Sequence, residues 1–231
     1  MGAVDRIFIT VTKNMDKSLQ GILPEKDMSR CMFYESLVRI ADFKYRQTKL
    51  KPTTLEGIKE LVNGVLKPRA DDWIWMGWRK EKLWCLEIDD LYRTNLTAMQ
   101  RLWKYYFLAK KRTLMLIEDA IELFTKEVEL DLLPEQVSQC WGLSKMTVNN
   151  DIRQRHLYLQ CSFVEFLEFF ARVAKLKFDT GATKALSLQT WIEMLMDVMF
   201  PIVNMKRKEV VVEIEYQSVS EDELVEDKYF I

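Results

Sequence analysis

The chain has 231 residues, of which 48% are hydrophobic and 30% are charged, and its 34 lysines and arginines nearly balance its 35 aspartates and glutamates. A chain of this length can bury a hydrophobic core in one large domain or two small ones. The balanced charge argues against nucleic-acid binding, because proteins that bind phosphate backbones usually carry a basic excess. Residues 1–10 do not resemble a signal peptide, and no segment approaches the ~18 apolar residues of a membrane span. We therefore expect a cytosolic protein without membrane insertion.

The low content of glycine and proline, at 7 and 5 residues, favours long helices over a sheet with many turns. Apolar residues recur at helical spacing in four segments, and the fold class predicted is therefore all-α. These segments are residues 31–45, 54–66, 163–177 and 187–199.

Polar and proline residues mark the ends of the shorter segments. Thr54 and Ser187 are expected to be the N-caps of the helices that begin there, because short hydroxyl side chains accept hydrogen bonds from the first helical N–H groups. Pro68 and Pro201 are expected to end the same helices, since the residue before a proline disfavours the helical conformation.

An internal repeat relates the first two of the predicted helices to the last two. Residues 32–68 align with residues 165–201 at a constant offset of 133, without a gap and with 10 identities in 37 positions. The identities include two charged residues of the first helix, Glu35 with Glu168 and Arg39 with Arg172, and they continue to the proline at the end. Each copy is therefore predicted to be a pair of helices from a duplicated unit.

The segments CSFVEFLEFFARVA and RLWKYYFLAKKRTLMLIEDAIELF resemble the exit half of one EF-hand and the whole of the hand before it. In this alignment Cys161 and Met115 hold loop position 8, while Glu165 and Asp119 hold position 12. The repeat adds a third hand, with Met32 at position 12. The chain is thus similar to EF-hand-pair proteins of ciliates and other flagellated protists, with hands near 3–45, 96–126 and 136–178.

The resemblance implies a calmodulin-like helical fold and a ciliary or flagellar setting. Paired hands share a short two-stranded bridge through their position-8 residues, so Met115 and Cys161 are expected to face each other. The first hand has no neighbour in sequence to pair with. Either residues 69–95 or a partner protein is expected to complete it.

The loops lack the ligands that calcium needs. A calcium loop offers oxygen atoms at positions 1, 3 and 5, a glycine at position 6 and a bidentate glutamate at position 12. The second hand has Leu108, Lys110 and Arg112 at positions 1, 3 and 5, and the third hand has Gln154, His156 and Tyr158 there.

Only position 12 of two hands keeps a carboxylate, so Asp119 and Glu165 are the remaining candidates for metal ligands. No metal and no other cofactor is predicted. An unconventional ion site formed by Asp16, Glu25 and Asp27 in the first loop is the alternative that the sequence leaves open.

The predicted organisation has four parts, which are an EF-hand-like half over 1–68, a tryptophan-rich connector over 69–95, an EF-hand-like pair over 96–204 and a tail over 205–231. Tryptophan and tyrosine often anchor protein interfaces. The connector is expected either to pack onto both halves or to bind a partner. Its candidate partner-binding residues are Trp73, Trp75 and Trp78.

The tail changes pattern after Pro201. Residues 210–216 alternate apolar and polar side chains as a strand does, and residues 218–227 are acidic. Tyr229, Phe230 and Ile231 form an apolar tip that is a further candidate for partner binding.

The sequence gives little support for an enzymatic function. His156 is the only histidine, and no glycine-rich phosphate loop is present. The four cysteines show no spacing suited to zinc or a redox pair, and they are interpreted as reduced thiols among apolar neighbours.

The predicted function is therefore a non-catalytic, calcium-independent scaffold or adaptor that binds other proteins of a larger assembly in the cytoplasm, in a cilium or axoneme according to the resemblance. A calcium-responsive EF-hand regulator is the main alternative, and a small-molecule binder is a third.

Overall fold

The computed structural model describes residues 2–13, 28–69, 75–128, 130–146 and 148–210. The regular secondary structure of this part is helical apart from one pair of two-residue strands, so the predicted all-α class is confirmed. The elements are α1 (Ala3–Lys13), α2 (Arg30–Ala41), α3 (Thr54–Glu60), α4 (Trp75–Trp78), α5 (Leu86–Thr94), α6 (Leu96–Ala109), β1 (Met115–Leu116), α7 (Ile117–Thr125), α8 (Pro134–Ser144), α9 (His156–Leu159), β2 (Gln160–Cys161), α10 (Phe163–Phe178) and α11 (Leu188–Met199).

Turns of other helical types extend several of these helices. A π-helical turn, η2 (Asp42–Arg46), continues α2, and η3 (Leu61–Leu66) continues α3 in the same way. Short segments η4 (Lys67–Arg69), η6 (Arg79–Leu83), η7 (Gly181–Thr183) and η8 (Phe200–Val203) complete the described helices. With these extensions, the helices predicted over 31–45, 54–66, 163–177 and 187–199 are confirmed.

One of the two predicted helix caps is correct. The Ser187 hydroxyl accepts a hydrogen bond from the Thr190 N–H at 3.1 Å, as expected of an N-cap. The prediction for Thr54 is wrong, because Thr53 has the extended backbone of an N-cap and Thr54 already lies inside α3. The Thr54 hydroxyl instead donates to the Asp42 carboxylate at 2.6 Å, which ties the start of α3 to the end of α2.

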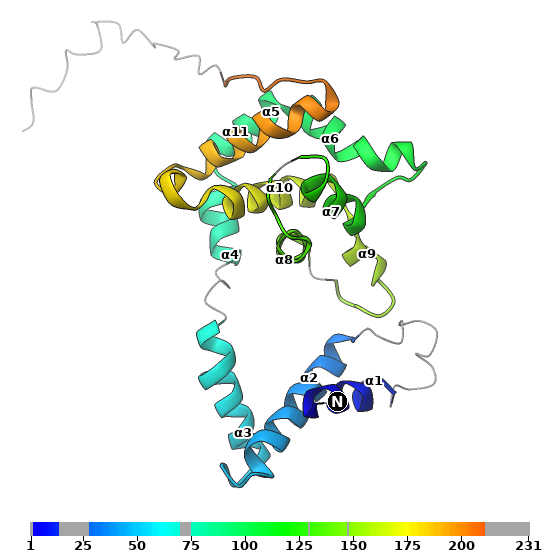
Figure 1. Cartoon of the computed structure of the whole chain (residues 1–231), viewed down its shortest axis with the longest axis vertical. Coiled ribbons are helices and arrows are strands. Elements are labelled where there is room, and N and C mark those ends of the chain that lie inside the picture. Colours follow the sequence, from blue (N-terminus) through cyan, green and yellow to red (C-terminus); the bar gives the residue numbers. More distant parts are fainter. Residues whose placement is uncertain (1, 14–27, 70–74, 129, 147, 211–231) are drawn as a thin grey trace, which may run out of the picture.

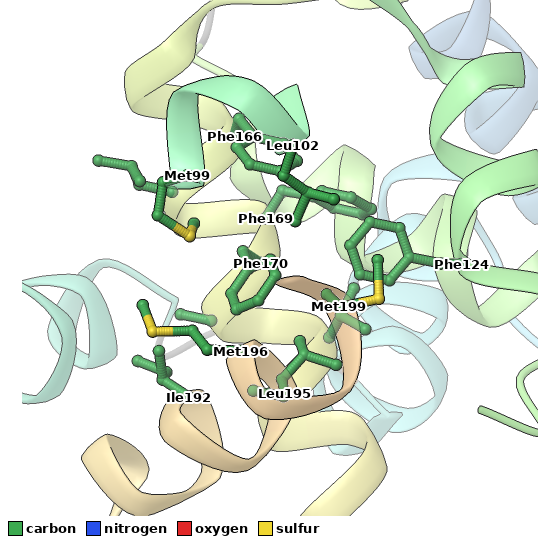
Figure 2. Close-up of a cluster of buried hydrophobic side chains, with 14 of the residues drawn as sticks. Met99, Leu102, Phe124, Phe166, Phe169, Phe170, Ile192, Leu195, Met196 and Met199 are labelled. Atoms are coloured by element: carbon green, nitrogen blue, oxygen red, sulfur yellow. The ribbon is translucent and has the colours of Figure 1, made fainter. Parts of the chain in front are cut away.

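Helices α1 to α3 form a smaller group below the larger group of α4 to α11 (Figure 1). The larger group holds the main hydrophobic core, to which α5, α6, α7, α8, α10 and α11 all contribute buried side chains. Helix α10 is central to this core, because its residues from Phe166 to Ala174 are all buried. Figure 2 shows Phe170 in the middle of the cluster, between Leu102 of α6 and Leu195 of α11.

Aromatic rings join the helices around α10. The Phe169 ring meets the Phe124 ring of α7 edge to face at 5.2 Å between centroids, and it meets the Trp141 ring of α8 at 5.6 Å. Such pairs stabilise a core by about 0.5–1.5 kcal/mol beyond the burial of their area. They hold α7 and α8 against α10 and thus help to set the geometry of the loops that follow α6 and α8.

The connector contributes to the same core. Leu83, Ile88 and Leu91 are buried there, and the Tyr92 hydroxyl donates to the Leu167 carbonyl of α10 at 2.8 Å. Its described residues therefore pack on the C-terminal helices. Whether the connector also contacts the N-terminal half stays a prediction. The domain boundaries proposed at 68, 95 and 204 stay predictions.

Among the described residues, the short loop after α8 contacts the smaller group. The Arg30 guanidinium donates to the carbonyls of Val148 and Asn149 at 2.8 and 2.9 Å, while the Arg30 N–H donates to Asp151 at 2.7 Å. Ile152 packs against the small apolar cluster between α1 and α2. The loop after α8 therefore contacts the first helical pair, and the expectation that residues 69–95 or a partner protein complete this pair stays a prediction.

The end of the described chain also packs on the larger group. The Asn95 side chain accepts from the Lys208 N–H at 2.8 Å and donates to the Lys208 carbonyl at 3.0 Å, as a paired strand residue would. Val210 contacts the main core, and the remaining residues of the strand expected over 210–216 lie outside the described part.

No helix in the described part of the chain is both long and apolar enough to span a membrane.

Candidate functional site

The candidate site consists of two loops, 108–119 and 154–165, that lie side by side. Strands β1 and β2 pair in antiparallel fashion with Met115 opposite Cys161, so the predicted pairing of these two residues is confirmed. Both side chains are fully buried, and the Trp103 indole N–H donates to the Cys161 carbonyl at 3.2 Å. The two position-12 carboxylates, Asp119 and Glu165, lie in the first turn of the helix that follows each strand.

Asp119 is buried beneath two cations of its own loop. The Lys110 ammonium lies 2.7 Å from Asp119 Oδ1, and the Arg112 guanidinium lies 2.5 and 2.6 Å from its two oxygens. The Leu116 N–H donates to the same carboxylate at 3.1 Å. The residues at positions 3 and 5, where calcium would need oxygen ligands, therefore carry positive charges that bind the position-12 carboxylate.

Glu165 is held by a cation from outside its loop. The Lys145 ammonium, at the end of α8, lies 2.7 Å from Glu165 Oε2 and also donates to the backbone carbonyl of Gln160. These are the position-12 carboxylate and the position-7 backbone carbonyl, two of the groups that bind the ion in a calcium loop. The Trp141 ring lies 5.5 Å from the same ammonium, and the Lys145 side chain is only 4% exposed.

Backbone N–H groups complete the environment of Glu165. The carboxylate accepts from the Met146 N–H at 3.1 Å and from the Ser162 N–H at 3.0 Å. The Ser162 hydroxyl accepts in turn from the Glu165 N–H, so the two residues form a capping box at the start of α10. Glu165 thus joins the end of α8, strand β2 and the start of α10.

The cations lower the pKa of both carboxyls. Burial raises the pKa of Asp119, but the Lys110 ammonium, the Leu116 N–H and the Arg112 guanidinium outweigh burial and hold it below its usual value. Burial likewise raises the pKa of Glu165, and the Lys145 ammonium with the Ser162 and Met146 N–H groups brings it below its usual value. Both groups are therefore ionised partners of fixed cations at neutral pH.

The two loops offer few other ligands. Among the described residues, no group of three His, Cys, Asp or Glu side chains could hold a metal ion. His156 is exposed at the start of α9. The acidic residues Asp16, Glu25 and Asp27 of the alternative ion site lie outside the described residues.

Lys145 is the functional residue that the sequence did not reveal. It lies 20 residues before Glu165 and belongs to no motif, since the helical period of α8 has already ended there. Only the pairing of the loops brings its ammonium to the Gln160 carbonyl. Lys110 and Arg112, by contrast, could be recognised because they replace expected ligands.

The proposed partner-binding residues fall into three groups. Trp78 packs against the main core, and its ring lies 4.5 Å from the Arg172 guanidinium, so this residue is used within the chain. Trp75 is described by its backbone alone, as the first residue of α4. Trp73 and the tip of Tyr229, Phe230 and Ile231 lie outside the described residues.

The cysteines are free thiols, but they do not share one environment. Cys140 and Cys161 are buried, and burial raises their pKa to about 11 and about 12. Cys85 is half-buried. The prediction of apolar surroundings is wrong for Cys31, which is exposed near the start of α2, where its Sγ lies 3.0 Å from the Ser29 hydroxyl.

Comparison of the chain with protein-family models, curated proteins and solved structures finds no match.

The Lys145 contact predicts a large loss of stability in Lys145→Met. The substitution keeps the length of the apolar stem but leaves Glu165 and the Gln160 carbonyl without their cation, and it should lower the free energy of unfolding by about 2–3 kcal/mol. The exposed Lys184 provides a matched control, and Lys184→Met should change stability by less than about 0.5 kcal/mol. Urea unfolding followed by tryptophan fluorescence measures both, and equal effects would contradict the assignment.

The lowered pKa of Glu165 predicts how stability depends on pH. A carboxyl with a lower pKa in the folded state stabilises the protein above its unfolded pKa of about 4.3, and this contribution disappears as the pH falls through the folded value. Glu165→Gln should therefore be less stable than the wild type at pH 7, with a difference that shrinks below about pH 4. Glu118→Gln, at an exposed position of α7, serves as the control, and a difference independent of pH would exclude this role for Glu165.

Proposed function

We propose that the protein is a non-catalytic, calcium-independent adaptor built from EF-hand-like helical pairs. The observation that carries this proposal is the Lys145 ammonium, which contacts the Gln160 carbonyl and the Glu165 carboxylate as a bound cation would. Lys110 and Arg112 contact Asp119 in the neighbouring loop in an equivalent way. The position-12 carboxylate of each loop is therefore already paired with a positive charge of the chain, and a divalent cation would have to displace that charge.

This arrangement removes the usual basis of calcium sensing. A sensor changes conformation because calcium binds one arrangement of the helices more tightly than the other. A lysine or arginine on the same chain is present at a fixed effective concentration, so the loop is held in one state whatever the calcium level. The pairing of β1 with β2 and the position of α10 then serve as permanent structure.

An adaptor also needs surface for partners, and the first helical pair offers it. Phe33, Tyr34 and Val38 are large apolar residues of α2 that are 48%, 62% and 42% exposed. Exposed apolar groups that lie together often mark interaction surfaces. The ciliary or axonemal setting rests on the sequence resemblance alone.

Calcium titration tests the proposal. Isothermal calorimetry of the full chain, stripped of metal and titrated to about millimolar calcium, should give no saturable heat. The melting temperature should be the same in calcium and in chelator, because a ligand that binds only the folded state raises it.

A fitted calcium site, or a rise of several degrees in calcium, would favour the calcium-responsive regulator instead. Magnesium at the same concentration controls for effects of ionic strength.

A further inference from the structure

The two copies of the internal repeat carry the same ion pair in opposite environments. In the first copy Arg39 pairs with Glu35 at 2.7 Å along α2, and in the second Arg172 pairs with Glu168 at 2.7 Å along α10. The two pairs are equivalent in the repeat, at an offset of 133. The side chains of the first pair are 43% and 48% exposed, whereas those of the second are 9% and 5% exposed.

Trp78 and Arg79 cover the pair of the second copy. The Arg79 guanidinium lies 2.7 Å from Glu168 Oε2 and donates to Oε1 at 2.9 Å. The Trp78 ring stacks over the Arg172 guanidinium at 4.5 Å. An aromatic residue followed by an arginine thus contacts both charges of the pair. The arginine binds the carboxylate, and the aromatic ring stacks on the cation.

The first copy keeps the same face uncovered. Tyr34 and Val38, which lie beside the ion pair on α2, correspond in the repeat to Leu167 and Ala171, which are buried in the second copy. Next to them, a groove of about 400 Å³ runs between α1, α2 and the start of α3 and is lined by Val38, Arg39, Asp42, Phe43 and Thr54 among others. The first copy therefore keeps its ion pair exposed beside this surface, and no described segment covers the pair as Trp78 and Arg79 do in the second copy.

We infer that this face of α2 binds a helical segment of a partner protein in which an aromatic residue is followed by an arginine, as in Trp78 and Arg79. The partner arginine binds the Glu35 carboxylate, the aromatic ring stacks over Arg39, and apolar residues of the segment cover Tyr34 and Val38. The covering segment of the second copy is the template for this chemistry. Because the inference names what the proposed adaptor binds, it rests on that function, although it does not involve the calcium-like loops.

A peptide of residues 75–92 of this chain, with Cys85→Ser to prevent oxidation, serves as the probe. Its binding to the full chain is measured by fluorescence anisotropy of a labelled peptide. We expect saturable binding to the wild type and at least tenfold weaker binding to Glu35→Lys, which opposes the peptide arginine with a cation. A peptide with Trp78→Ala and Arg79→Ala should bind at least tenfold more weakly than the original.

Two further variants separate this surface from other sites. Glu118→Lys makes the same change of charge on an exposed position of α7 and should bind as the wild type does. Val38→Asp, which places a charge on the apolar part of the face, should weaken binding as Glu35→Lys does. Circular dichroism establishes that each variant is folded.

Absence of saturable binding to the folded wild type would overturn the inference. Equal binding to the wild type and Glu35→Lys would also overturn it, since the peptide would then be replacing its own copy on Glu168. Neither result would alter the calcium titration, so the proposed function can stand or fail separately.

Discussion

The contact on which the paired loops depend is a lysine ammonium placed between a backbone carbonyl and a carboxylate. Lys145 lies at the end of α8, and its ammonium donates to the Gln160 carbonyl of β2 and to the Glu165 carboxylate of α10. A buried carboxylate is costly unless a cation and hydrogen-bond donors compensate it. The ammonium compensates Glu165 and also satisfies a carbonyl beside the strand, so that β2 can keep its register with β1.

The two loops reach the same electrostatic result by different routes. In loop 108–119 the cations are Lys110 and Arg112, which belong to the loop itself, whereas loop 154–165 borrows Lys145 from the preceding helix. Both solutions place positive charge on the carboxylate that begins the following helix. In the proposed function, these cations take the place of a diffusible ion beside α7 and α10.

A second consequence concerns the use of one unit in two ways. The repeat supplies the same helix with the same Glu and Arg pair twice, but residues 75–95 follow the first copy and cover only the second. The C-terminal copy thereby becomes the centre of the core, while the N-terminal copy retains exposed apolar side chains on α2. Two similar helical units, one covered and one open, thus give the chain both a hydrophobic core and an exposed surface.

Sequence reasoning predicts the helices well because their apolar periods and capping residues are local signals. The resemblance to EF-hand pairs also predicts the register of Met115 with Cys161, since it assigns both residues to loop position 8. Sequence reasoning misplaces the cap at Thr54 by one residue, because adjacent threonines offer the same hydroxyl and only the backbone conformation distinguishes them.

The contacts that the sequence does not reveal are those between distant residues. Lys145 with Gln160, and Arg30 with the loop at Val148, depend on how helices pack and leave no periodic trace. The sequence indicates Trp78 as a candidate for binding a partner, but it does not show that the Trp78 ring stacks on Arg172 of the same chain.

A double-mutant cycle between Lys145 and Glu165 tests the central claim most directly. The free energies of unfolding of the wild type, Lys145→Met, Glu165→Gln and the double variant give the coupling energy of the two side chains. If the ammonium holds the loop as a bound cation would, the coupling should be at least about 1.5 kcal/mol. A coupling within a few tenths of a kcal/mol, as for an exposed ion pair, would contradict it.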